Sequence, residues 1–66
     1  MFVTLYHHRS RKKFEKWLRK RDITFTFKGY ACGYYDPAYL LDAEPSEWDK
    51  CPVSVWNKYG NLIHEV

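Results

Sequence analysis

The sequence contains no apolar run long enough to cross a bilayer, and its first residues lack the long apolar stretch of a secretory signal. It contains only two cysteines, Cys32 and Cys51. These absences predict a cytoplasmic protein with no membrane association. In a reducing cytosol both cysteines stay thiols, and a disulfide between them is the alternative.

Internal repeats, linkers and low-complexity segments are also absent. The 66 residues therefore predict a single domain, residues 1–66, and a chain this short buries only about 60% of the surface that its unfolded form exposes. Aromatic residues compensate, since Trp, Tyr and Phe make up 20% of the chain. Each large ring buries roughly 150–250 Å², so we expect most of these rings to fill the core.

The spacing of apolar residues predicts one main helix and four strands. Phe14, Trp17 and Leu18 follow Ser10, a favourable N-cap, at helical spacing and predict an amphipathic helix over residues 11–21. Strict alternation over residues 23–27 predicts a strand, and the helix before it predicts parallel pairing with the first strand through a right-handed crossover. The remaining predicted elements are strands at residues 3–6, 52–56 and 62–66, a short helix at residues 38–41 after Asp36-Pro37, and one turn around Trp48.

Two stretches resemble the glutaredoxin branch of the thioredoxin fold. The first joins Val3-Thr4-Leu5-Tyr6, a helix ending in Trp17-Leu18, and Ile23-Thr24-Phe25; the second joins Pro52-Val53-Ser54-Val55-Trp56, five turn residues and Leu62-Ile63. They are similar to the family's first strand, active-site helix and second strand, and to the segment after its cis-proline. The resemblance implies an α/β fold with a four-stranded mixed sheet and a cis peptide bond before Pro52.

The chain departs from this family where the family has its active site. A glutaredoxin carries one or two cysteines at the start of its first helix, where the helix N-terminus lowers the thiol pKa. Here the same stretch is His7-His8-Arg9-Ser10-Arg11, so we expect no redox catalysis, no catalytic residue and no cofactor. The family's closing helix is missing too, which leaves part of one sheet face uncovered. That face is either solvated, as Thr24 and Thr26 indicate, or covered by a partner or a second copy.

Positive charge is concentrated in the first half of the chain. Residues 1–28 carry a net charge of +7, whereas residues 29–66 carry −4. Like charges four positions apart on a helix, such as Lys12 and Lys16, repel by a few tenths of a kcal/mol, so their accumulation indicates an anionic partner. The predicted binding residues are Arg9, Arg11, Lys12, Lys13, Lys16, Arg19 and Lys20, with Arg21 beside them. The alternative is a solubilising face, balanced within the molecule by Asp42, Glu44, Glu47 and Asp49.

Two kinds of partner fit this helix. An acidic protein surface would make the chain a non-enzymatic adaptor or inhibitor, and charge would steer the encounter. A nucleic acid would place its phosphates on the helix and stack unpaired bases on Tyr30, Tyr34 and Tyr35. The alternative for these tyrosines is packing over the sheet edge. The fold resembled is not a usual reader of nucleic acids, which places the acidic protein first.

The remaining candidate sites are less specific. A third hypothesis is thiol chemistry at Cys51, with its pKa lowered by a nearby histidine or by Arg9. No metal site is expected, since the spacing of the metal-binding residue types matches no zinc motif. No feature pairs the acidic residues with a base, so we expect no acid–base enzyme. The metal-binding types are His7, His8, His64, Cys32 and Cys51, and the acids are Asp36, Asp42 and Glu44.

Overall fold

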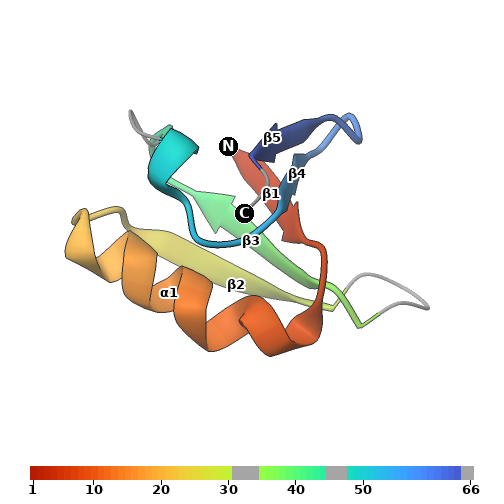
Figure 1. The fold of residues 1–66 in the computed structure, drawn as a ribbon, viewed down its shortest axis with the longest axis horizontal. Helices are drawn as coiled ribbons and strands as arrows, with labels where there is room; N and C mark the ends of the chain where they lie inside the picture. Colours follow the sequence, from red (N-terminus) through yellow and green to blue (C-terminus); the bar gives the residue numbers. More distant parts are fainter. Residues whose placement is uncertain (31–34, 45–47, 65–66) are drawn as a thin grey trace.

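The computed structural model describes residues 1–30, 35–44 and 48–64. The described chain forms one α-helix, two short 3₁₀ helices and five strands (Figure 1). In chain order they are β1 (Phe2–Leu5), η1 (His8–Ser10), α1 (Arg11–Lys20), β2 (Phe25–Tyr30), β3 (Pro37–Leu41), η2 (Trp48–Lys50), β4 (Val55–Asn57) and β5 (Leu62–His64). None of the helices in these residues has the length and apolar character needed to span a membrane.

The five strands form one sheet in the order β2-β3-β1-β4-β5, and every neighbouring pair is antiparallel. The α/β class is confirmed, but the prediction of a four-stranded mixed sheet is wrong. Strands β1 and β2 do run in the same direction, because both are antiparallel to β3. They do not pair with each other, because β3 lies between them. Strand β3 follows β2 after a short connection, and strands joined in this way pair as antiparallel neighbours.

Strand β3 replaces the short helix predicted at residues 38–41. Leu40 lies opposite Phe2 of β1 and opposite Thr26 of β2, so β3 is bonded on both sides. Pro37 is tolerated because it is the first residue of the strand. Ala, Tyr and Leu fit a helix or a strand, and pairing with two neighbours overrides the local helix preference.

The other elements overlap the predicted ones but differ at their ends. Strand β4 begins three residues later than the strand predicted at residues 52–56, and β5 covers residues 62–64 of the strand predicted at 62–66, whose last two residues lie outside the described residues. Helix α1 is confirmed to within one residue, but Ser10 is itself helical and its side chain makes no capping bond. Instead His7 caps η1, accepting a hydrogen bond from the backbone N–H of Arg9 at 3.2 Å. Strand β2 starts two residues later than predicted and continues to Tyr30, through a register shift at Gly29, whose φ is +97°. No cis peptide bond occurs in the described residues, so the prediction of a cis bond before Pro52 is wrong.

The core lies between α1 and one face of the sheet. Phe14, Trp17 and Leu18 of α1 are buried, and the ring of Phe14 meets Tyr39 of β3 edge-on at 5.3 Å between centroids. Trp48 of η2 stacks on Trp17 at 5.6 Å between ring centroids. The prediction that aromatic rings fill the core is confirmed for the rings of α1 and β3. The other buried residues of this core are Val3, Leu5, Leu41, Cys51, Val53 and Val55.

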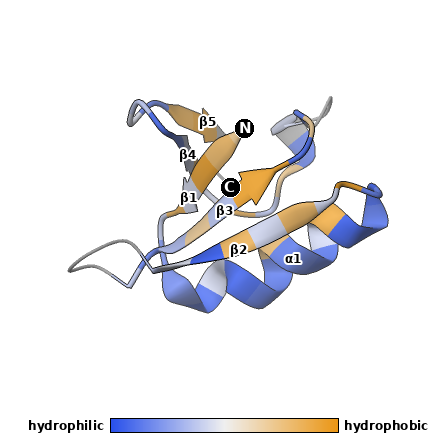
Figure 2. Cartoon of the chain, turned by 180° about the vertical axis from the view of Figure 1, so that it is seen from behind, coloured by the Kyte–Doolittle hydropathy of each residue, from blue (hydrophilic) through white to orange (hydrophobic). Residues whose placement is uncertain are grey.

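The opposite face of the sheet carries no helix of the described chain (Figures 1 and 2). On it Phe2 lies opposite Leu40, and Trp56 lies opposite Leu62. Leu40 and Leu62 are 42% and 40% exposed. Covering of this face by a second copy stays a prediction.

Candidate functional site

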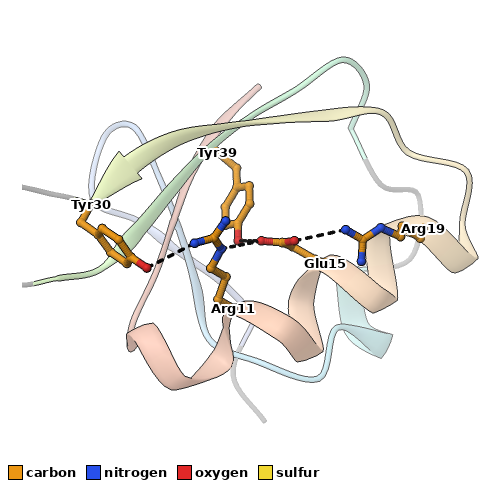
Figure 3. Close-up of polar contacts among 5 residues, drawn as sticks. All are labelled: Arg11, Glu15, Arg19, Tyr30 and Tyr39. Atoms are coloured by element: carbon orange, nitrogen blue, oxygen red, sulfur yellow. Dashed lines mark hydrogen bonds and ion pairs between the residues drawn. The ribbon is translucent and has the colours of Figure 1, made fainter.

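The cationic residues of α1 divide into two groups with different surroundings. The first group consists of Arg11 and Arg19, which lie four positions before and after Glu15. Arg11 Nε donates a hydrogen bond to Glu15 Oε2 at 2.7 Å, and Arg19 Nη2 donates to Glu15 Oε1 at 3.3 Å. Figure 3 shows the two guanidinium groups on either side of this one carboxylate.

The same carboxylate ties the helix to the sheet. The Tyr39 hydroxyl donates to Glu15 Oε2 at 2.6 Å, and Tyr39 is fully buried on β3. Arg11 Nη1 donates to the Tyr30 hydroxyl at 3.3 Å, and its guanidinium carbon lies 3.7 Å from the ring centroid of Phe27. Arg11 therefore contacts β2, as does Arg19, whose guanidinium carbon lies 5.5 Å from the ring centroid of Phe25, while Glu15 joins α1 to β3.

This network keeps its members in their ordinary charge states. Hydrogen bonds to Glu15 and Tyr30 raise the pKa of Arg11. Partial burial acts to raise the pKa of Glu15, but hydrogen bonds from Tyr39 and Arg11 outweigh it and lower that pKa below its ordinary value. Burial and the bond to Glu15 raise the pKa of Tyr39. At neutral pH the cluster is a stable arrangement of two cations, one carboxylate and a protonated phenol.

The second group of cations faces solvent. Lys12, Lys13, Lys16 and Lys20 are exposed, and none of them forms an ion pair within residues 1–30, 35–44 and 48–64. Arg9, one turn earlier on η1, is exposed as well. Asp42 and Glu44, predicted to balance the helix, form no ion pair with these lysines. Glu47 and the side chain of Asp49, predicted to do the same, lie outside the part of the chain that the structure describes.

Three of the lysines border a groove with an apolar wall. The groove has a volume of about 250 Å³ and is lined by Lys13, Lys16, Trp17, Lys20 and Pro52. Pro52 comes from the segment between η2 and β4, so the groove runs along the seam where this segment meets α1. Arg21 lies over the Trp17 ring, with its guanidinium carbon 4.5 Å from the ring centroid. The sequence pattern gives no sign of this groove, because no local feature brings Pro52 to the helix.

The structure brings two of the three predicted tyrosines together. Tyr30 and Tyr35 are 49% and 71% exposed, their ring centroids lie 6.5 Å apart, and with His8 they line a pocket of about 390 Å³. The Tyr30 ring also meets the Phe27 ring edge-on, at 5.4 Å between ring centroids. Tyr30 therefore packs at the sheet edge and is also partly exposed to solvent. Tyr34 lies outside the described residues.

Cys51 does not have the environment of a reactive thiol. It is a free thiol, 1% exposed, and it donates a hydrogen bond to the Val53 carbonyl at 3.4 Å. Burial raises its pKa, against the opposing hydrogen bond and the charge of Arg21. The prediction that a histidine or Arg9 lowers this pKa is wrong, because the side chain belongs to the core.

No group of three His, Cys, Asp or Glu side chains in the described part of the chain is close enough to hold a metal ion. The rings of His7 and His8 stack on each other at 4.5 Å between centroids. Asp42 and Glu44 border a separate surface groove near Lys58, away from α1. Cys32 lies outside the described residues.

Comparisons with protein-family models, curated proteins and solved structures found no match for this chain. The resemblance to the glutaredoxins stays a prediction that these comparisons do not support. We therefore infer function from the surfaces described above.

Proposed function

We propose that the chain is a non-enzymatic binding module that docks an acidic protein surface through the solvent-exposed lysines of α1. The observation that carries this proposal is the set of four exposed lysines on one helix, none with an ion-pair partner in the described residues: Lys12, Lys13, Lys16 and Lys20.

The repulsion among these lysines supports an anionic partner. Lys12, Lys16 and Lys20 follow one another at intervals of four residues, where like charges destabilise a helix by a few tenths of a kcal/mol per pair. A carboxylate-rich surface placed against them removes that repulsion. Such complementary charge also raises the rate of productive encounters.

The Glu15 network supports the proposal in a different way. It pairs Arg11 and Arg19 with a carboxylate of the same helix, and it fixes α1 on the sheet through Tyr39. A helix held in place before binding loses little further freedom when the partner arrives, which favours affinity. We therefore assign docking to the lysines and anchoring to the two arginines.

Nucleic acid is the second candidate, and the pocket of His8, Tyr30 and Tyr35 favours it. Exposed rings near basic residues can stack on unpaired bases. However, this pocket lies on the flank of α1 that faces β2, while the lysine-bordered groove lies on the flank that faces Pro52. A single strand would have to pass around the helix to use both, so we place the acidic protein first.

The surroundings of Cys51 disfavour the thiol hypothesis. A buried Cys51 with a raised pKa holds little thiolate at neutral pH, and the thiolate is the nucleophile in disulfide exchange.

The test compares two double variants that change the net charge equally. K16E/K20E replaces two of the four exposed lysines of α1, and K28E/K58E replaces one lysine on β2 and one in the turn between β4 and β5. The probes are a fluorescent peptide of alternating Asp and Glu, single-stranded DNA, single-stranded RNA and duplex DNA, followed by anisotropy at physiological salt. We expect K16E/K20E to weaken peptide binding by about tenfold or more and K28E/K58E to change it by less than about twofold.

Equal weakening by both variants would show a response to net charge alone and refute the docking surface. Tighter binding of a single-stranded nucleic acid than of the peptide, lost when Tyr30 and Tyr35 are replaced, would replace the first candidate with the second. Absence of binding to every probe would refute both.

A further inference from the structure

We infer that the groove between α1 and Pro52 holds an aromatic side chain of the acidic partner, so that the docked segment is an acidic peptide with one aromatic anchor. This inference rests on the proposed function and adds the chemistry of the partner's segment. Its basis is the position of an apolar groove between cations that have no partner in the described chain.

The size of the groove fits one side chain. Its volume of about 250 Å³ lies below the roughly 300–1,000 Å³ typical of small-molecule pockets. One wall is Trp17 and the other is Pro52, and lysine side chains lay their methylene stems along such apolar surfaces while their ammonium groups stay in water. The groove therefore offers an apolar interior under a cationic rim.

The rim determines what flanks the anchor. Lys13 lies at one side of the groove, and Lys16 and Lys20 follow along the helix. Carboxylates before and after the anchor would meet these ammonium groups, and an aromatic ring between them would also present its electron-rich face to a lysine. Aromatic anchors in well-packed pockets, inside a polar rim, are common at the centre of protein interfaces.

Within the chain, Trp17 already has one aromatic neighbour from an acidic stretch. Trp17 already stacks on Trp48 at 5.6 Å between ring centroids. Trp48 belongs to an acidic stretch, since Asp42, Glu44, Glu47 and Asp49 lie within six residues of it. The indole of Trp17 thus packs against an aromatic ring from an acidic segment of this chain, and the groove leaves room for a second ring beside it.

Helix α1 of a second copy is a poor occupant of this groove. The helix that borders it carries four exposed lysines, and its counterpart would carry the same four. Like charges placed across an interface oppose association. The complementary occupant is a different, acidic segment.

Two peptides of equal charge test the inference. Both alternate Asp and Glu, and the central residue is Phe in one and Ser in the other. We expect the protein to bind the Phe peptide about tenfold more tightly than the Ser peptide, which corresponds to ~1.4 kcal/mol. In the variant P52S, which removes one wall, this preference should fall to about twofold or less while affinity for the Ser peptide stays the same.

Lys12 provides the matched control, because it lies on the same helix but does not line the groove. K12Q should weaken both peptides equally and leave the preference for Phe unchanged. A direct readout avoids dependence on the folding of P52S: the indole N–H resonance of Trp17, whose nitrogen is buried and has no acceptor among the described residues, should shift with the Phe peptide and not with the Ser peptide.

Equal affinity for the two peptides, with both weakened by K16E/K20E, would overturn the groove inference and leave the proposed function standing. Loss of all peptide binding would remove both. A Phe preference that persists in P52S, without a shift of the Trp17 resonance, would place the anchor elsewhere and overturn the inference.

Discussion

Replacing Glu15 by Gln tests whether the arginines of α1 anchor the helix rather than bind a partner. The substitution keeps the shape of the side chain and removes its charge. Three hydrogen bonds end on the Glu15 carboxylate, from Tyr39 at 2.6 Å, Arg11 at 2.7 Å and Arg19 at 3.3 Å. A neutral amide accepts at one atom only, and its nitrogen would face a donor.

The magnitude depends mainly on the contact with Tyr39. The Arg11 and Arg19 side chains are 37% and 66% exposed, so water screens their pairing with Glu15. Tyr39 is fully buried, and a hydrogen bond between a buried donor and a charged acceptor contributes roughly 1.5–3 kcal/mol. We expect E15Q to lower the free energy of unfolding by about 2 kcal/mol, which for a domain of this size lowers Tm by about 8–16 °C. That is a large fraction of the roughly 3–10 kcal/mol expected for the whole domain.

The assay is urea unfolding followed by tryptophan fluorescence, since Trp17 and Trp48 pack in or beside the core. A double-mutant cycle with Y39F isolates the contact and should give a coupling energy of about 1 kcal/mol or more. K12Q, on the solvent side of the same helix, should change stability by less than about 0.5 kcal/mol. An E15Q protein as stable as K12Q, with no coupling to Y39F, would show that the network is an ordinary surface ion pair and refute the division of α1 into anchoring and docking residues.

The remaining predictions concern titration of two groups. The pKa of Glu15 in the folded protein is lowered from 4.5, so its contribution to stability is present above about pH 4.5 and is lost as the pH falls through the lower folded value. The wild-type protein should therefore lose stability in acid more steeply than E15Q. Urea unfolding midpoints of the two proteins that run parallel against pH would contradict this. Because burial raises the pKa of Cys51 above 9.0, its alkylation by iodoacetamide should be slow in the folded protein, with a pH midpoint above that of a free thiol. Rapid labelling of Cys51 near neutral pH would contradict its buried position. Labelling in urea, where the chain is unfolded, provides the control.

Local patterns were sufficient to predict the elements whose residue spacing fits only a helix or only a strand. The 3.6-residue spacing of Phe14, Trp17 and Leu18 predicted α1 to within one residue. The alternation of residues 23–27 predicted β2, although the strand begins and ends later. The concentration of positive charge on α1 was also evident, because charge depends on composition alone.

Local patterns failed where pairing decides between two possibilities. Residues 38–41 suit a helix or a strand, and only hydrogen bonding to β1 on one side and β2 on the other makes them β3. That strand then occupies the position beside β1 in which β2 was predicted, and it changes a mixed sheet into an antiparallel one.

The same distinction applies to the candidate site. The spacing of Arg11, Glu15 and Arg19 is visible in the sequence, but the bond from Tyr39 joins residues 24 positions apart and converts a helix-surface pair into an anchor. Likewise Pro52 borders the same groove as Trp17 although the two residues are distant in the sequence, and the pKa of Cys51 is raised because its side chain is buried. The sequence by itself determined how much positive charge α1 carries. The tertiary structure decided which of those charges remain available, because neutralisation, burial and contact depend on neighbours that are distant along the chain.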